Sequence, residues 1–235
     1  MSFFERPALE FTTGPHPEAT IIWLHGLGAD GADFAVFAET LAGVSPSPLR
    51  FVFPHAPVRA VALNAGLSMP AWFDLYGTRP EDPQDEIGIR RALEAVSGLI
   101  THESRRGIPP ERIVLGGFSQ GGAIALHTAL TGPSRLAAAV GLSTYLPLAN
   151  RLAEDLPAAN RGTPVFLAHG TEDLTLPYAF AVKTLAVLKH AGVPATLHTY
   201  EGLGHGVCDR EVEALARFLT GVFSAGALGA GATSV

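Results

Sequence analysis

The sequence has a single cysteine, no long apolar run and few charged residues, and each absence excludes a class of protein. Cys208 alone cannot form a disulfide within the chain or supply a zinc motif, so no metal site is expected. No apolar run approaches the roughly 20 residues that a helix needs to span a bilayer. Residues 1–6 lack the basic and then apolar pattern of a secretory signal. These absences predict a cytoplasmic protein without a membrane segment.

The low charge content also limits the partners. Asp, Glu, Lys and Arg make up 16% of the 235 residues, and the formal net charge is −6. The densest basic site, Arg105-Arg106, is too small for the basic stripe of a nucleic-acid-binding surface, so no nucleic-acid partner is expected. Hydrophobic residues make up 47%, which is typical of a globular chain. We expect one domain over residues 1–223, followed by a flexible tail rich in Ala and Gly over 224–235.

Short apolar runs without polar alternation are typical of strands buried on both faces of a parallel sheet. Four such runs and three weaker candidates occur, at 21–24, 113–115, 138–142, 165–168, 9–12, 49–53 and 195–200. Apolar stripes with helical spacing run over 89–100 and 212–219, and further helices are predicted over 33–41, 121–130 and 178–190. The alternation of strands and helices predicts an α/β fold, with helices on both faces of a mostly parallel central sheet.

One long segment has no clear element. Residues 54–83 are rich in Pro and Gly and carry Trp72, Phe73 and Tyr76. Loops of this length are uncommon in compact domains and are usually functional. We therefore expect this segment to contribute to a site.

A serine motif follows the apolar run at 113–115. In Gly117-Phe118-Ser119-Gln120-Gly121, a buried strand enters and a helix of small residues leaves. In that context, Gly-x-Ser-x-Gly places the serine on a sharp turn with its hydroxyl exposed above the sheet. Phosphate and dinucleotide loops need a Gly-Lys-Ser/Thr or a Gly-x-Gly-x-x-Gly pattern, and neither is present here. The motif therefore predicts Ser119 as a nucleophile.

A serine nucleophile needs a base, and the base needs a group that orients it. His205 lies between glycines, after the predicted strand 195–200 and before the last helix, which favours it over His169. The carboxylate is expected between nucleophile and base in the chain. Asp173 follows the predicted strand 165–168 and is favoured, with Glu172 as the local alternative.

Two backbone amides are candidates for an oxyanion hole. The N–H of Gln120 lies at the start of the helix after Ser119, where it faces the position of a developing negative charge. A second donor is expected from the turn after an earlier strand. His25-Gly26-Leu27-Gly28 follows the run at 21–24, and we expect the N–H of Leu27 to be that donor.

Several segments together resemble the phospholipase/carboxylesterase family of α/β-hydrolases. The matching segments are His25-Gly26-Leu27-Gly28, Phe53-Pro54-His55-Ala56-Pro57, Met69-Pro70-Ala71-Trp72-Phe73-Asp74, Gly117-Phe118-Ser119-Gln120-Gly121-Gly122, Gly141-Leu142-Ser143, His169-Gly170-Thr171-Glu172-Asp173 and Gly204-His205. The resemblance implies an α/β-hydrolase fold without a separate cap domain, a triad of Ser119, Asp173 and His205, and oxyanion amides at Leu27 and Gln120. It also implies that the loop around Trp72 lines the acyl site.

These residues predict a serine carboxylesterase that hydrolyses short- to medium-chain acyl esters through an acyl-enzyme, without metal or organic cofactor. An apolar acyl pocket for the small-molecule ester is expected from Leu27, Leu67, Met69, Trp72 and Phe118.

Other interpretations use the same residues. A thioesterase or lysophospholipase acting on long-chain acyl groups would need an extended apolar groove. A non-catalytic binding scaffold is a further alternative, although all three triad positions are filled. A peptidase of this fold would need an additional domain, for which the chain is too short. A homodimer sealed by apolar residues of the Trp72 loop is a further hypothesis.

Overall fold

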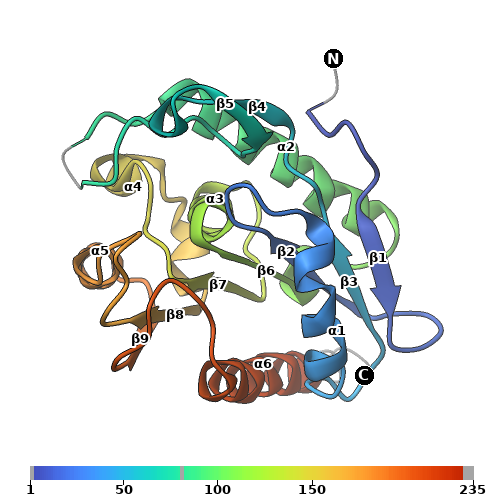
Figure 1. Ribbon diagram of the computed structural model, residues 1–235. Helices are drawn as coiled ribbons and strands as arrows, with labels where there is room; N and C mark the ends of the chain where they lie inside the picture. The colour runs from blue at the N-terminus through green and yellow to red at the C-terminus, as the bar shows by residue number, and fades with distance from the viewer. Residues whose placement is uncertain (1–2, 80–81, 230–235) are drawn as a thin grey trace.

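The structure is a computed structural model that describes residues 3–79 and 82–229 (Figure 1). Its centre is a seven-stranded sheet with the order β1-β3-β2-β6-β7-β8-β9. These strands are β1 (Leu9–Thr12), β2 (Ala19–Leu24), β3 (Leu49–Phe53), β6 (Ile113–Phe118), β7 (Ala138–Leu142), β8 (Val165–Gly170) and β9 (Ala195–Tyr200). The β1–β3 pair is antiparallel, and the other neighbouring pairs are parallel. The predicted mostly parallel sheet is confirmed.

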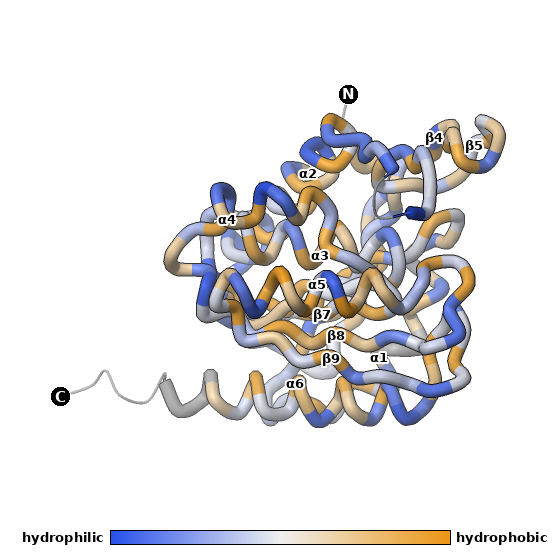
Figure 2. The backbone as a smooth tube through the Cα atoms, turned by 90° about the vertical axis from the view of Figure 1, so that its left-hand side faces the viewer, coloured by the Kyte–Doolittle hydropathy of each residue, from blue (hydrophilic) through white to orange (hydrophobic). Residues whose placement is uncertain are grey.

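Helices cover both faces of the sheet, as predicted (Figure 1). The α-helices are α1 (Ala35–Leu41), α2 (Glu86–Arg105), α3 (Ser119–Thr131), α4 (Leu152–Asp155), α5 (Ala179–His190) and α6 (Asp209–Gly229). Short 3₁₀ segments are η1 (Gly31–Phe34), η2 (Ala62–Asn64), η3 (Pro110–Arg112), η4 (Ala149–Arg151) and η5 (Ala158–Gly162). Figure 2 shows α6 on the opposite side of the strands from α3 and α5. The sheet is therefore the middle of three layers.

Strand β2 shows why the apolar runs do not alternate with polar residues. Ile22 and Leu24 pack in the core cluster that also contains residues of α2 and α3. Ile21 and Trp23 point the other way, into the cluster that contains residues of α1 and α6. Because both faces of the strand are covered, both sets of side chains are apolar.

The helices differ in how far the core surrounds them. In α3, every residue from Gln120 to Leu130 is buried, and most of them are apolar or small. The polar side chains in this stretch are those of Gln120, His127 and Thr128. In α2, the buried side chains include Ile89, Ala92 and Val96, which share one face, while the other face is exposed. The stripe expected over 89–100 is therefore the buried face of a longer helix.

Two expectations about irregular segments need correction. Within residues 54–83, β4 (Val58–Val61) and β5 (Leu67–Pro70) form an antiparallel hairpin. Half of its strand residues are exposed and only Val61 is buried, which explains why no buried-strand pattern marks it. Residues 224–229 are helical, because α6 continues to Gly229; only 230–235 of the expected tail lie outside the described residues.

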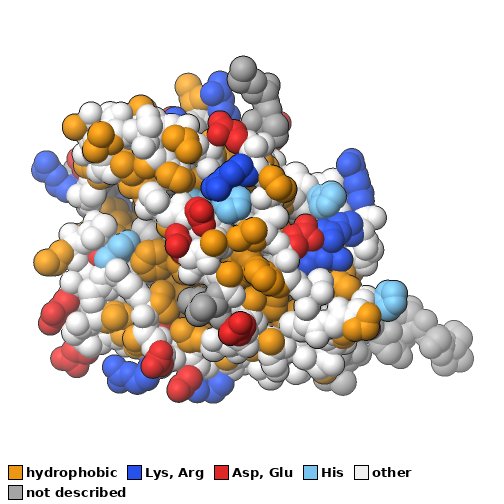
Figure 3. Space-filling model, turned by 45° about the vertical axis from the view of Figure 1, so that its right-hand side comes forward, with side chains coloured by type: hydrophobic (Ala, Val, Ile, Leu, Met, Phe, Trp, Pro, Cys, Tyr) orange, Lys and Arg blue, Asp and Glu red, His pale blue; other side chains and the backbone are white. Residues whose placement is uncertain are grey.

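The surface bears on the expected partners. No helix in the described ranges is both long and apolar enough to cross a membrane. On the face shown in Figure 3, basic side chains are interspersed with acidic ones. Trp72 is fully buried, so it cannot seal a dimer; Val58, Leu63 and Leu67 are exposed apolar residues of that segment. The homodimer remains a prediction.

We expect Gly121→Ala to lower the free energy of unfolding by about 2 kcal/mol, because the added methyl group overpacks the site against backbone atoms. A Cβ at this position would collide with the carbonyl oxygens of Leu24 and His25, at the end of β2. Gly98→Ala in α2 is the control, because nothing lies within 4 Å of its added Cβ. Alanine in a helix is about 1 kcal/mol better than glycine, so this variant gains stability. Urea denaturation measures both, and equal stability of the two variants would contradict the expectation.

Candidate active site

The serine motif forms a sharp turn between β6 and α3. Ser119 has a φ of 52°, which is left-handed backbone for a residue other than glycine. A Cβ at Gly117 would lie 2.6 Å from the carbonyl carbon of Gly121 and 2.7 Å from the carbonyl oxygen of Leu24. The glycines therefore let the turn pack directly on the backbone of β2, with Ser119 at the carboxyl edge of the sheet.

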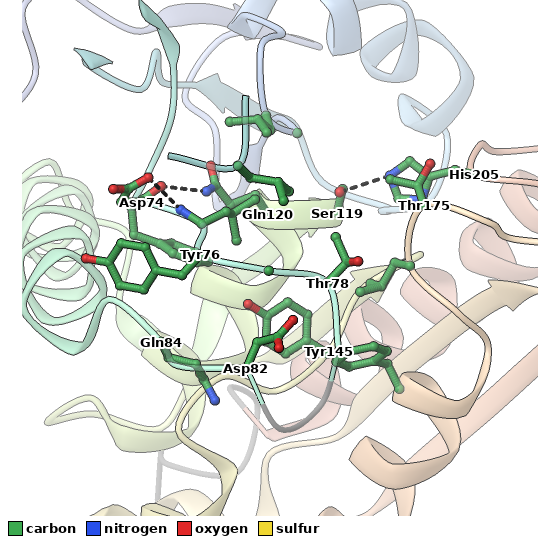
Figure 4. Close-up of a pocket in the computed structure, with 18 of the residues that line it drawn as sticks. Asp74, Tyr76, Thr78, Asp82, Gln84, Ser119, Gln120, Tyr145, Thr175 and His205 are labelled. Carbon is green, nitrogen blue, oxygen red and sulfur yellow. Dashed lines mark hydrogen bonds between the residues drawn. The ribbon is translucent and has the colours of Figure 1, made fainter. Parts of the chain in front are cut away.

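The structure brings Ser119, His205 and Asp173 together from three separate segments. Ser119 Oγ lies 3.0 Å from His205 Nε2 (Figure 4). On the other side of the ring, His205 Nδ1 lies 2.7 Å from Asp173 Oδ2. With the neutral imidazole donating its Nδ1 proton to the carboxylate, Nε2 is free to accept the hydroxyl proton. The geometry is that of a nucleophile, a base and an orienting carboxylate.

Backbone amides hold the Asp173 carboxylate. Its side chain is fully buried, and Oδ1 accepts hydrogen bonds from the N–H groups of Thr175 (2.9 Å) and Leu176 (2.7 Å). These bonds leave Oδ2 directed at His205. The alternative carboxylate, Glu172, is exposed to solvent, and His205 Nδ1 is bonded to Asp173 instead.

His169 is buried beneath this carboxylate and does not contact Ser119. Its Nε2 lies 2.8 Å from the carbonyl oxygen of Leu176 and 3.2 Å from Asp173 Oδ2. Burial lowers the pKa of His169, so the ring is held neutral as a donor to both oxygens. It therefore supports the turn that carries Asp173.

Both predicted oxyanion amides lie next to Ser119, on turns of fixed shape. Gln120 is in the first turn of α3, and Leu27 is in the turn after β2. Both residues line the same cavity as Ser119. The His25 ring holds the Leu27 turn: its Nε2 accepts from Ala56 N–H at 3.0 Å, so its Nδ1 donates to the Gly26 carbonyl at 2.7 Å. Burial lowers the pKa of His25, which maintains this neutral form.

The side chain of Gln120 has a structural role that sequence reasoning missed. Its Oε1 accepts from the Trp72 N–H at 2.9 Å, and its Nε2 donates to the Phe73 carbonyl at 2.8 Å. Trp72 Nε1 in turn donates to the His25 carbonyl at 2.8 Å. These bonds join the segment around Trp72 to both turns that carry the candidate oxyanion amides.

A cavity of about 470 Å³ adjoins Ser119 and His205. Figure 4 shows these two residues at one side of it, with Asp74, Tyr76 and Gln84 at the other. Much of its wall is apolar and comes from Leu63, Phe73, Leu75, Tyr145, Leu146, Ala149, Leu176 and Phe180. Its size lies within the ordinary range of small-molecule sites, roughly 300–1,000 Å³.

The structure places only part of the expected acyl pocket along this cavity. Leu27 and Phe118 line it, but Leu67, Met69 and Trp72 do not. Leu67 is 66% exposed on the β4–β5 hairpin, and Trp72 is fully buried behind the site. The sulfur of Met69 accepts a hydrogen bond from the Asn64 side chain at 3.2 Å. The expectation for these three residues is corrected accordingly.

Other lining residues were missed because they come from distant segments. Tyr145 and Leu146 follow β7, and Phe180 belongs to α5. Their apolar side chains have no local pattern that separates a cavity wall from ordinary core. Residues 73–79 and 82–84 line the cavity and belong to, or adjoin, the segment expected to form a site.

The sheet order, the serine turn and the three joined side chains define the class of α/β-hydrolases. The family model described as Phospholipase/Carboxylesterase matches residues 11–223. The chain belongs to this phospholipase/carboxylesterase family, as the sequence resemblance predicted, and it is therefore a hydrolase.

Relatives and solved structures agree with this assignment. The chain is 37% identical to acyl-protein thioesterase 1 of Neurospora crassa, over 93% of each chain. It is 36% identical to acyl-protein thioesterase 1 of Mycosarcoma maydis, over 96% of this chain and all of that one. The crystal structure of Zea mays acyl-protein thioesterase 2 superimposes with a TM-score of 0.79 at 30% identity, covering 92% of this chain and 99% of that chain.

A buried carboxyl group in α6 predicts a pH-dependent stability. Glu211 is fully buried in the first turn of α6, and burial raises its pKa from 4.5 to about 7. Between these values the folded protein binds the proton more tightly than the unfolded chain does, so stability falls as pH rises from about 4.5 to 7.

We expect Glu211→Gln to remove this dependence. Relative to wild type, its free energy of unfolding should rise across that window by up to about 3 kcal/mol, at roughly 1.4 kcal/mol per pH unit. Urea denaturation at several pH values measures the difference. Glu213→Gln, whose side chain on the same helix is 67% exposed, is the control and should show no such trend. A difference for Glu211→Gln that is constant with pH would contradict the expectation.

Proposed function

We propose that this chain is a serine hydrolase that cleaves long-chain acyl thioesters, such as acylated cysteine side chains, through an acyl-enzyme on Ser119. The observation that carries the proposal is the hydrogen-bonded chain Ser119–His205–Asp173 beside an apolar cavity. The similarity to acyl-protein thioesterases over most of the chain supports the thioester alternative over the short- to medium-chain carboxylesterase expected first.

The first half of the reaction acylates Ser119. His205 Nε2 takes the hydroxyl proton as Oγ attacks the thioester carbonyl, and the N–H groups of Leu27 and Gln120 hold the resulting oxyanion. Asp173 stabilises the imidazolium. The tetrahedral intermediate then collapses, the C–S bond breaks, and His205 protonates the leaving thiolate.

The second half releases the acid by the same route. Water attacks the acyl-enzyme carbonyl while His205 takes its proton, and the oxyanion again lies between the two amides. Collapse breaks the bond to Ser119 Oγ, which regains a proton from His205. The net change adds one water to one thioester and leaves a carboxylic acid and a thiol, with no cofactor consumed.

The apolar wall of the cavity supports a long acyl chain as the substrate. Phe73, Leu75, Leu146, Ala149 and Phe180 present side chains that an alkyl chain can cover, with a gain of roughly 0.8 kcal/mol per buried CH₂. Short acyl groups would leave much of this wall in contact with water. The same wall would accommodate the acyl chain of an ester, so matched ester and thioester substrates distinguish the leaving group.

We expect Ser119→Ala to abolish hydrolysis and labelling by a fluorophosphonate, because both need the hydroxyl. Ser104→Ala in α2 is the matched control; its hydroxyl donates to the Ile100 carbonyl, outside the cavity, so labelling should persist. Wild type should hydrolyse palmitoyl thioesters faster than acetyl or butyryl ones. A maximum at short chains would reject the long-chain assignment, and absence of a Ser119 adduct in wild type would favour a non-catalytic scaffold.

Filling the cavity should change chain-length preference. Ala149 lines it from η4, so Ala149→Phe places a larger apolar side chain in the space proposed for the acyl chain. We expect kcat/KM for palmitoyl substrates to fall about tenfold, since losing about 1.4 kcal/mol of binding corresponds to that factor. Acetyl substrates should be hydrolysed at the wild-type rate. An equal loss for both chain lengths would place the acyl chain elsewhere.

A further inference from the structure

A threonine outside the triad donates a hydrogen bond to the backbone of the candidate nucleophile. Thr144 is the second residue after β7, and its side chain is 2% exposed. Its Oγ1 donates to the carbonyl oxygen of Ser119 at 2.6 Å. The preceding Ser143 has a φ of 46°, a left-handed conformation at the point where the chain leaves the strand.

The carbonyl that Thr144 contacts belongs to the same peptide group as the Gln120 N–H. Because a peptide group is planar, a hydrogen bond that holds the Ser119 oxygen also sets the direction of the Gln120 N–H. A bond accepted by the oxygen also polarises the group, and it strengthens the N–H as a donor. Thr144 therefore bonds the oxygen on one side of this peptide group, and through it affects the N–H that would face an oxyanion on the other side.

The Thr144 side chain is held in place by packing. A Cβ at Gly122 would lie 2.9 Å from Thr144 Cβ and Cγ2, and a Cβ at Gly141 would lie 2.7 Å from Cγ2. The methyl group thus occupies space that two glycines leave open. This packing keeps the hydroxyl directed at Ser119, so little conformational freedom is lost when the bond forms.

We propose that Thr144 is a positioning residue of the oxyanion site, acting through the Ser119–Gln120 peptide group. This inference rests on the proposed function, because it assigns the Gln120 N–H as an oxyanion donor. Thr144 does not line the cavity in which the substrate would lie. Its effect is therefore on the stability of the tetrahedral intermediate and not on the choice of leaving group.

The test compares Thr144→Val with Thr144→Ser. Valine keeps the shape of threonine but lacks the hydroxyl, and serine keeps the hydroxyl. Removing an oxyanion donor outright costs about 10²–10³-fold in kcat. Since Thr144→Val retains the donor and removes only its support, we expect a smaller loss in kcat, about five- to tenfold, with KM within twofold of wild type. Thr144→Ser should recover kcat to within about threefold.

Thr128→Val in α3 is the matched control. Thr128 is also 2% exposed, and its Oγ1 donates to the Ile124 carbonyl at 2.7 Å. The substitution removes the same kind of bond, from a buried threonine hydroxyl to a backbone carbonyl of α3. Thr128 does not line the cavity. We expect its kcat to equal that of wild type, whatever its effect on the unfolding midpoint.

A transition-state analogue separates positioning from a general structural role. A trifluoromethyl ketone forms a tetrahedral adduct with the serine, whereas a thioether analogue of the substrate has no carbonyl to form an oxyanion. Thr144→Val should weaken binding of the ketone by the same factor by which it lowers kcat/KM. It should leave binding of the thioether unchanged. Its pH–rate profile should keep the wild-type inflections, because the histidine and its carboxylate are untouched.

The outcomes distinguish this inference from the proposed function. If wild type forms no fluorophosphonate adduct on Ser119, the proposed function fails. If wild type is labelled and active but Thr144→Val keeps the wild-type kcat, the role assigned to Thr144 is overturned. Equally weakened binding of the ketone and the thioether would overturn that role as well, because such a result would show a general loss of structure.

Discussion

The close packing of α3 on the end of β2 is the constraint on which the site depends. Gly117 and Gly121 let the two backbones meet without side chains between them. The turn between β6 and α3 is therefore so tight that Ser119 adopts a φ of 52°. Such a conformation costs on the order of 1–3 kcal/mol, and it persists because the fully buried α3 is held by the surrounding core.

Around this turn, polar side chains make hydrogen bonds to backbone groups of neighbouring segments. Gln120 joins the backbone of the Trp72 segment, and Trp72 joins the His25 carbonyl. His25 in turn holds the backbone beside Leu27, and backbone amides hold the Asp173 carboxylate. Groups that are oriented before substrate arrives need little reorganisation during the reaction, which is how a preorganised site stabilises charge.

Much of the fold is visible in the sequence because its signals are local. The strands at 21–24, 138–142 and 165–168 are buried on both faces, so continuous apolar runs mark them. The β4–β5 hairpin was missed because only Val61 of its eight strand residues is buried, so burial imposes no pattern on them. The end of α6 was missed because Ala- and Gly-rich composition does not distinguish a continuing helix from a loose tail.

The sequence alone determined the family, the α/β architecture and the candidate residues Ser119, Asp173 and His205, because strand–turn–helix context and chain order are properties of short segments. Only the tertiary structure decided what lines the cavity. Trp72 proved to be buried support, while Phe180, from a helix about sixty positions beyond Ser119, forms part of the wall. An apolar side chain looks the same in sequence whether it faces a core or a cavity, and long-range packing alone separates the two.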